Sequence, residues 1–266
     1  MRLLLGTGGF AYQDWVGLLY PEGSRRQDWI RFYAERFNAL EFNASFYALP
    51  GEKTFAGLLR KSGGRLCFSV KLHRSMTHER SAKPEAYARL KGAVSPLKEA
   101  GLLGPFLAQF PQSFHRTREN RRYLLELVAR FEGERLAVEF RHLSWYREEV
   151  FAAFRERGLI LVAPDYPPLP GLPPFRLVPT SSTAYLRLSG RNRSAWHEAT
   201  SAAERYDYRY SPDELKGFVE VLKAHEGVLQ EAWVIFNNTS KGHALFNLET
   251  FRSLFEAAGL GPGPKA

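Results

Sequence analysis

Short apolar runs alternate along this chain with segments whose apolar residues recur at helical spacing. The runs predict eight strands, at residues 3–7, 39–43, 66–71, 106–110, 136–140, 159–163, 184–188 and 232–237. Helical spacing is clearest in segments 124–131 and 211–222. The second of these begins with Ser211, Pro212 and Glu214, which together form a capping box and predict a helix start.

A strand followed by a helix, repeated eight times, predicts a parallel sheet with helices outside it. Eight such units in 266 residues close most economically into a single-domain α/β fold, a TIM-type (β/α)8 barrel over residues 1–266. No linker, repeat or low-complexity segment divides the chain. One connection is irregular, because residues 164–179, between strands six and seven, contain too many prolines for a regular helix. The alternative fold is an open, doubly wound sheet.

Polar residues recur at every second position near the C-terminal ends of the predicted strands. They are Glu41, Asn43, Ser69, Lys71, Gln109, Glu139, Arg141, Arg187, Ser189 and Asn237. Alternate residues of a barrel strand point inward, so this set should converge inside the C-terminal mouth, where barrel enzymes hold their active sites. Buried charges must pair with one another or meet a ligand. The alternative is a structural ion-pair network that plugs the barrel.

The charged residues of this set suggest catalytic roles. We expect Glu139 to act as the general acid or base, with Glu41 and Lys71 as a coupled pair beside it. Lys71 is either held as a cation by Glu41 or desolvated, in which case it can serve as a base or form a Schiff base. Glu139 should pair with Arg141 or Arg187. A glycosidase carboxylate pair made of Glu41 and Glu139 is an alternative that rests on placement alone.

The remaining polar side chains predict a binding site for a small anion, because the guanidinium fork suits carboxylate and phosphate groups. The expected substrate-binding residues are Arg141, Arg187, Asn43, Gln109, Asn237, Asp165 and Tyr12. Lys71 could join Arg141 and Arg187 in binding the anion, and Arg191 and Arg193 could extend this set of cationic side chains. Segment 190–210 is long and polar, and we expect it to form a lid over the mouth.

Several classes of chemistry lack their signatures. The single Cys67 excludes an internal disulfide framework and a cysteine-based zinc cluster. No G-x-S-x-G nucleophile elbow, dinucleotide fingerprint or Walker motif is present, so no nucleotide cofactor is indicated and the cofactor stays unknown. A divalent metal is a further alternative; its candidate ligands are Glu41, Glu139, Asp165 and His78.

The net charge favours anionic partners, since the chain contains 37 Lys and Arg residues but only 28 Asp and Glu residues. One hypothesis is an enzyme of hydrolase or lyase type acting on a small anionic, phosphorylated or sugar-like substrate. The alternative is a nucleic-acid-binding or nucleic-acid-processing protein that uses its basic surface and an aromatic rim around the mouth, whose side chains could stack on bases. The rim consists of Tyr12, Trp15, Tyr47, Trp145, Trp196, Tyr206 and Tyr208. A barrel that binds a metabolite without turning it over is a third hypothesis.

No apolar run approaches the ~20 residues of a membrane span, and the start MRLLLGTGGF is short for a signal peptide, so we expect a cytoplasmic protein.

Motifs spread over nearly the whole chain resemble the YecE-like family, domain-of-unknown-function family 72. They are GTGGFAYQDW (6–15), YPEG (20–23), YAERFNALEFNASFYALP (33–50), THE (77–79), VEFRHLSW (138–145), YLRLSGR (185–191), YDYRYSPDEL (206–215) and FNNTSKGHA (236–244). The resemblance implies a TIM-type barrel and no particular reaction. Two motifs depart from the family pattern: Gly8 and Phe10 replace a serine and a tryptophan, and Ser189 replaces a histidine.

Overall fold

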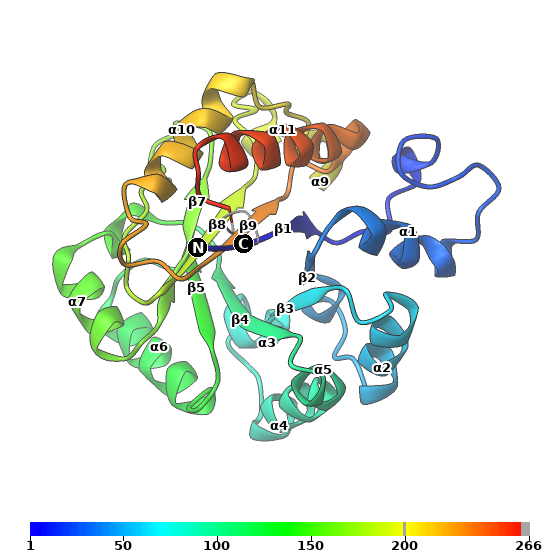
Figure 1. Cartoon of the computed structure of the whole chain (residues 1–266). Coiled ribbons are helices and arrows are strands. Elements are labelled where there is room, and N and C mark those ends of the chain that lie inside the picture. Colours follow the sequence, from blue (N-terminus) through cyan, green and yellow to red (C-terminus); the bar gives the residue numbers. More distant parts are fainter. Residues whose placement is uncertain (199–200, 262–266) are drawn as a thin grey trace.

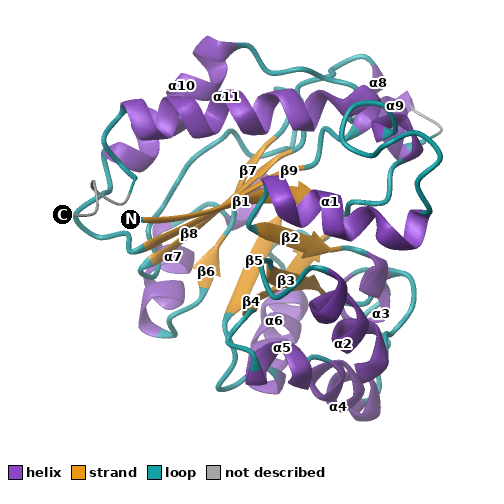
Figure 2. Cartoon of the chain, turned by 45° about the vertical axis from the view of Figure 1, so that its right-hand side comes forward, coloured by secondary structure: helices purple, strands orange, loops and turns teal. Residues whose placement is uncertain are grey.

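A barrel of parallel strands surrounded by helices forms the protein (Figures 1 and 2). The computed structural model describes residues 1–198 and 201–261. The strands are β1 (Arg2–Gly8), β2 (Ala39–Phe42), β3 (Cys67–Lys71), β4 (Leu103–Phe110), β5 (Leu136–Phe140), β6 (Ile160–Leu161), β7 (Ala163–Asp165), β8 (Thr183–Leu188) and β9 (Glu231–Phe236).

The strand order closes the sheet almost completely. Hydrogen-bonded neighbours follow the order β6-β5-β4-β3-β2-β1-β9-β8-β7, all parallel. Only Val162 separates β6 from β7; β6 pairs with β5, whereas β7 pairs with β8. In the described residues, nine strands therefore occupy eight barrel positions. The predicted TIM-type barrel is confirmed, with its sixth strand split in two, and the open doubly wound sheet is excluded.

Helices cover the outside of the barrel (Figure 1). They are α1 (Trp29–Arg36), α2 (Glu52–Lys61), α3 (Arg74–Thr77), α4 (Pro84–Ala93), α5 (Ser95–Glu99), α6 (Arg118–Arg130), α7 (Glu148–Glu156), α8 (Ala195–Glu198), α9 (Ala202–Arg205), α10 (Pro212–Lys223) and α11 (His243–Ala257), with single 3-10 turns at Gln13–Trp15, Arg26–Asp28, Ala44–Phe46, Leu143–Trp145 and Ser240–Gly242. The predicted capping box begins α10: the Ser211 and Glu214 side chains each accept a hydrogen bond from the other's backbone amide. None of the described helices has the length and apolar composition to cross a membrane.

The connection from β7 to β8 contains no helix in its described residues, as its prolines predicted. The gap in the ring of helices therefore falls at the one irregular unit that the sequence indicated.

The barrel interior changes character along its axis. Near the N-terminal ends of the strands it is filled by a cluster of apolar side chains that includes Leu4, Ala39, Cys67, Ala137 and Trp233. Toward the C-terminal ends the inward positions become polar, as the alternating pattern predicted. This apolar layer forms the floor of the barrel, and the polar positions lie above it, toward the C-terminal mouth.

Close packing in this floor generates a prediction at Gly104 of β4. A Cβ atom there would lie 2.2 Å from Cζ2 of the Trp233 indole. Gly104→Ala should therefore lower the free energy of unfolding by about 1–3 kcal/mol, because the buried indole must shift. Gly92→Ala is the matched control: no described atom lies within 4 Å of a Cβ at this exposed site in α4, and alanine there should be neutral or stabilising. Equal stability of Gly104→Ala and the wild type in urea unfolding would contradict this packing.

Candidate active site at the barrel mouth

A buried arginine joins two carboxylates across the mouth. Arg187, on β8, donates from Nε and Nη2 to both oxygens of Glu41 on β2, at 2.8 and 2.6 Å. Its Nη1 donates to Oε2 of Glu139 on β5. All three side chains are at most 3 % exposed. We call these three residues the Arg187 clamp.

Hydroxyl groups complete the surroundings of the clamp. The Tyr185 hydroxyl lies 2.9 Å from Oε2 of Glu41 and 2.8 Å from the Ser69 hydroxyl. The Tyr166 hydroxyl donates to Oε1 of Glu139. The oxygens of both carboxylates are therefore engaged, as buried charges require.

The clamp fixes the charge of Glu139. Burial alone would raise its pKa, but Arg187, Arg141 and the Tyr166 hydroxyl outweigh burial and lower that pKa to about 2. Arg141 Nε lies 3.4 Å from Oε1 of Glu139. The prediction that Glu139 pairs with Arg141 or Arg187 is confirmed, and the structure contains both contacts. Glu139 is thus ionised at neutral pH and has no proton to donate.

Lys71 has a different partner from the one expected. The predicted ion pair between Glu41 and Lys71 is wrong, because Arg187 takes both Glu41 oxygens. Glu41 pairs in register with Ser69, which places Lys71 two residues further toward the mouth. Its Nζ lies 4.4 Å from the centroid of the Phe46 ring. No described carboxylate lies within 4 Å of this amine.

The surroundings of Lys71 favour the uncharged amine. Burial, followed by the nearby guanidinium groups of Arg187 and Arg141, lowers its pKa from 10.5 to about 7. Near pH 7, therefore, Lys71 exchanges readily between a cation and a neutral amine.

A cavity of about 560 Å³ opens directly above the clamp. Its lining consists of Gly8, Tyr12, Asp14, Asn43, Phe46, Tyr47, Lys71, His78, Gln109, Arg141, Arg187, Arg205, Tyr206, Asn237, Thr239 and Ser240. All the predicted substrate-binding residues except Asp165 are in this set, together with Lys71. Glu41 and Glu139 lie beneath it in the clamp. We call this space the mouth cavity.

Buried polar atoms in the mouth cavity lack partners. Asn43 Oδ1 and Arg205 Nε are both shielded from solvent and have no hydrogen-bond partner among the described residues. An unpaired buried polar atom costs about 1–3 kcal/mol, and such atoms in a cavity are commonly satisfied by a ligand or water. Both atoms therefore favour a polar occupant.

Glycine at position 8 shapes one wall of the mouth cavity. A Cβ there would lie 2.0 Å from Oδ1 of Asn237 and 2.8 Å from Nδ2 of Asn43. A serine side chain at this position would therefore displace one of these amides. Ser189, the other departure, is fully buried and accepts a hydrogen bond from Asn237 Nδ2 at 3.4 Å. Both departures thus set the position of the Asn237 amide.

Asp165 belongs to a second ion-pair cluster, outside the mouth cavity. Arg191 Nε and Nη2 contact its two oxygens at 2.9–3.1 Å, and Arg191 Nη1 donates to Glu214 at 2.9 Å. The Tyr210 hydroxyl donates to Asp165 at 2.7 Å. Arg191 therefore ties the end of β7 to α10 and does not join the cationic side chains Lys71, Arg141 and Arg187 at the mouth cavity. Arg193 lies with Arg191 along a separate open hollow.

The four candidate metal ligands do not converge. Glu41 and Glu139 face Arg187, and Asp165 faces Arg191. Burial and the neighbouring Lys71 lower the pKa of His78 to about 4, so this imidazole is neutral at pH 7. The described part of the chain holds no group of three or more His, Cys, Asp or Glu side chains suited to a metal ion.

Tyr206 is a functional candidate that sequence reasoning named only as part of an aromatic rim. Its hydroxyl accepts a hydrogen bond from Arg141 Nη2 at 3.2 Å. Burial opposes its ionisation, but Arg141 outweighs burial and lowers the pKa of this phenol. Segment 190–210, the predicted lid, brings Arg205 and Tyr206 to the cavity wall; residues 199–200 of that segment lie outside the described residues. Nothing in the local sequence identified Arg141 as the partner of this tyrosine.

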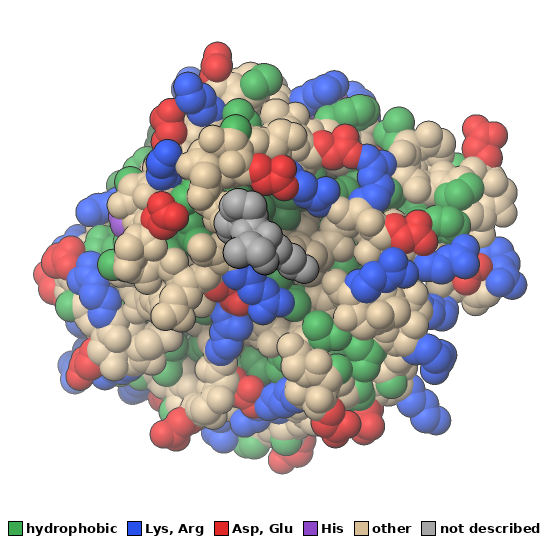
Figure 3. Space-filling model, in the orientation of Figure 1, with side chains coloured by type: hydrophobic (Ala, Val, Ile, Leu, Met, Phe, Trp, Pro, Cys, Tyr) green, Lys and Arg blue, Asp and Glu red, His purple; other side chains and the backbone are tan. Residues whose placement is uncertain are grey.

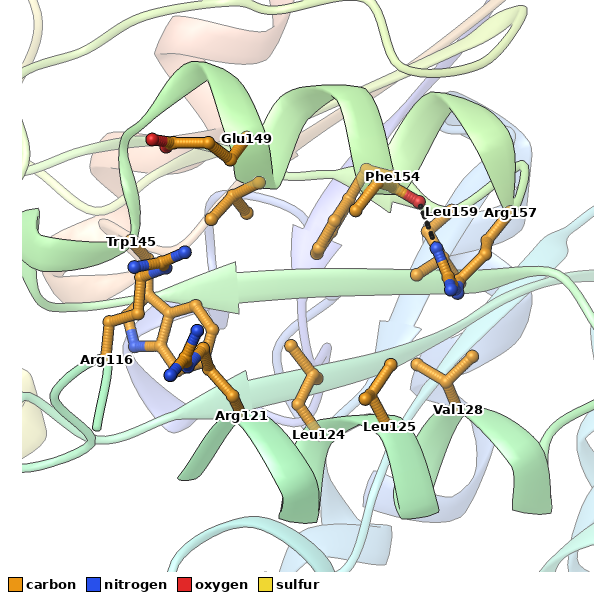
Figure 4. Close-up of a pocket in the computed structure, with 12 residues that line it drawn as sticks. Arg116, Arg121, Leu124, Leu125, Val128, Trp145, Glu149, Phe154, Arg157 and Leu159 are labelled. Atoms are coloured by element: carbon orange, nitrogen blue, oxygen red, sulfur yellow. Dashed lines mark hydrogen bonds between the residues drawn. The ribbon is translucent and has the colours of Figure 1, made fainter. Parts of the chain in front are cut away.

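A second pocket lies on the outer surface between α6 and α7 (Figure 4). It holds about 140 Å³ and is walled largely by apolar side chains such as Leu124, Val128 and Phe154, with Arg116 and Arg121 at one end. Its shape follows from the packing of two helices, and its few polar groups do not converge. The mouth cavity, larger and polar, is the candidate active site.

The clamp generates a stability prediction. Glu139→Gln should lower the free energy of unfolding by about 3–5 kcal/mol at pH 7, because Arg187 loses one buried counter-charge. The pKa of Glu139 is lower in the folded state, so its contribution is complete above about pH 4.5 and is lost as the pH falls toward 2. The difference between wild type and Glu139→Gln in urea unfolding should therefore shrink over that range.

The matched control for this substitution is Glu126→Gln. Glu126 forms an exposed pair with Arg122 at 3.8 Å and should contribute less than about 1 kcal/mol. If Glu139→Gln cost no more than this control at pH 7, the clamp would not stabilise the fold as described.

Comparison with known proteins places the chain in a family. The family model described as "Protein of unknown function DUF72" matches residues 4–266. UPF0759 protein YunF of Bacillus subtilis (strain 168) is 28 % identical over 278 residues, which cover 98 % of each chain. A crystal structure of a DUF72 family protein from Thermotoga maritima MSB8 has 38 % identity and a TM-score of 0.88, and the match covers 96 % of this chain and 100 % of that one. For a DUF72 family protein from Enterococcus faecalis V583 the values are 25 % identity, a TM-score of 0.84, and coverage of 100 % and 99 %. The resemblance of the sequence motifs is thereby confirmed, and this chain belongs to the DUF72 family of proteins of unknown function.

Proposed function

We propose that this protein is an enzyme that binds a small anionic substrate in the mouth cavity and acts on it by acid–base chemistry. One observation carries the proposal: Lys71 lies in the cavity wall without a carboxylate partner. Among the neighbouring side chains, the charges of Arg187 and Arg141 balance those of Glu41 and Glu139. When Lys71 is protonated, the cavity therefore carries a net positive charge.

The cavity offers donors that suit an anion. Arg141 is 17 % exposed and can present its remaining N–H groups to a carboxylate or phosphate while Glu139 and Tyr206 hold the guanidinium in place. The amides of Asn43 and Asn237, which lie against Gly8, would orient the rest of the substrate. Asp14 and Arg205, one charge of each sign, line the same cavity and leave this balance unchanged.

The proposed catalytic roles differ from those expected at first. Lys71, with a pKa near 7, is suited to accept a proton, and Tyr206 is suited to donate one. Glu139 and Glu41 act as positioning residues, since both carboxylates bind the guanidinium of Arg187. A glycosidase pair is disfavoured, because such a pair needs one protonated carboxyl. Glu139 has a pKa of about 2, and both oxygens of Glu41 accept hydrogen bonds from Arg187.

Nucleic-acid binding receives less support. Three of the rim aromatics expected to stack on bases, Trp15, Trp145 and Trp196, are at most 5 % exposed. On the face drawn in Figure 3, Lys and Arg side chains are interspersed with Asp and Glu and form no continuous basic surface. We therefore propose an enzyme that acts on a small anion, and the binding experiment below includes a short oligonucleotide as the competing ligand.

Sulfate binding measured by calorimetry tests the proposal. Wild type should bind sulfate, and Arg141→Gln and Lys71→Met should bind it at least about tenfold more weakly, because each loses a charge-assisted contact. Arg116→Gln, in the outer pocket between α6 and α7, is the matched control and should bind as the wild type does. Sulfate does not titrate between pH 6 and 9, so its affinity for wild type should fall as the pH rises through 7 and Lys71 loses its proton. The affinity of Lys71→Met should not change.

Three results would contradict the proposal. The first is no sulfate binding by the wild type. The second is sulfate binding by Lys71→Met and Arg141→Gln with the same affinity as the wild type. The third is binding of a short oligonucleotide only, with a steep salt dependence. The last result would support the nucleic-acid hypothesis instead.

A further inference from the structure

Lys71 meets the requirements of a nucleophilic amine. It lines the mouth cavity, as no other lysine in the described residues does. Its Nζ lies over the face of Phe46 and has no hydrogen-bond or ion-pair partner among those residues. A lysine held by a carboxylate would keep its proton and be unreactive, whereas one desolvated beside other cations is activated.

Burial and two neighbouring cations act in the same direction. Burial is the largest effect that disfavours a proton on Lys71, and Arg187 and Arg141 add to it; together they outweigh the opposite effect of Glu41 and Glu139. With a pKa near 7, about half of the amine is neutral at pH 7, roughly a thousandfold more than for an ordinary exposed lysine. The geometry of the cavity thus supplies both access to Lys71 and a reactive form of it.

We propose that Lys71 is a Schiff-base lysine, which forms a covalent imine with a small carbonyl compound that carries a carboxylate or phosphate group. The inference rests on the proposed function and deepens it, because it names the substrate class. Arg141 would bind the anionic group and so bring the carbonyl carbon to the amine. A 2-oxo acid and an aldehyde phosphate both have this chemistry, with the two groups a few bonds apart.

The bond changes balance without a further reactant. The Nζ lone pair attacks the carbonyl carbon, the carbonyl oxygen gains a proton and the amine loses one, which gives a carbinolamine. Its hydroxyl then leaves as water after taking a proton from the Tyr206 phenol, and the nitrogen lone pair forms the C=N bond of the protonated imine. The phenolate that remains is stabilised by Arg141, whose Nη2 lies 3.2 Å from the Tyr206 oxygen. Such an imine withdraws electrons from the adjacent carbon, as lyase chemistry requires.

Reductive trapping tests this inference. The full-length protein is incubated with pyruvate, glyoxylate or glyceraldehyde 3-phosphate in the presence of cyanoborohydride, and adducts are located by peptide mass spectrometry. We expect one adduct per chain on Lys71 in the wild type. Lys71→Arg, which keeps the positive charge, should lose that adduct, whereas Lys53→Met, at an exposed lysine of α2, should keep it. Acetone, which has a ketone but no anionic group, should label Lys71 at least about tenfold more slowly than pyruvate, and Arg141→Gln should remove that difference.

Other outcomes would overturn the inference. These are the absence of a Lys71 adduct with all three compounds, labelling of Lys53 as fast as Lys71, and equal labelling by acetone and pyruvate. If trapping fails while sulfate still binds through Arg141 and Lys71, the imine is wrong and the anion-binding enzyme stands. If sulfate binding fails as well, both proposals fail. Thermal unfolding of Lys71→Arg verifies that loss of the adduct does not reflect loss of the fold.

Discussion

The guanidinium of Arg187, buried between Glu41 and Glu139, is the interaction on which the mouth of this barrel depends. An unpaired charge at this depth would cost several kcal/mol, so two carboxylates from β2 and β5 converge on one arginine from β8. The clamp joins strands that are far apart in the sheet. Because Glu41 and Glu139 both pair with Arg187, neither forms an ion pair with Lys71.

Two layers of side chains follow from this arrangement. The clamp lies in the lower layer, with Ser69 and Gln109 at the same height in neighbouring strands. Two residues further along the strands, Lys71 and Arg141 form the cationic wall of the mouth cavity. Buried ion pairs add little net stability compared with apolar packing, but they fix positions. The lower layer therefore serves to orient the upper one, where a ligand can be reached.

The sequence predicted the barrel and its mouth because both depend on local periodicity. Alternating polar positions placed Asn43, Gln109 and Asn237 correctly at the cavity. Pairing was harder to predict, because it depends on distances across the barrel. The adjacency of β2 and β3 suggested a pair between Glu41 and Lys71, but the register sets these residues at different heights.

Other features had no local signal at all. The break at Val162 and the exchange of partners between β6 and β7 depend on how the sheet closes. The contact of Tyr206 with Arg141 depends on the path of a segment without apolar periodicity. Gly8 stood out in the sequence only as a departure from a family motif, and nothing local indicated the two amides that approach it.

A crystal structure of the protein grown with sulfate tests this arrangement most directly. We predict sulfate in the mouth cavity, in contact with Lys71 and Arg141, above an Arg187 clamp with both carboxylates still bound. A mouth cavity without sulfate, or a sulfate seated directly on Arg187 with Glu41 or Glu139 displaced, would contradict it.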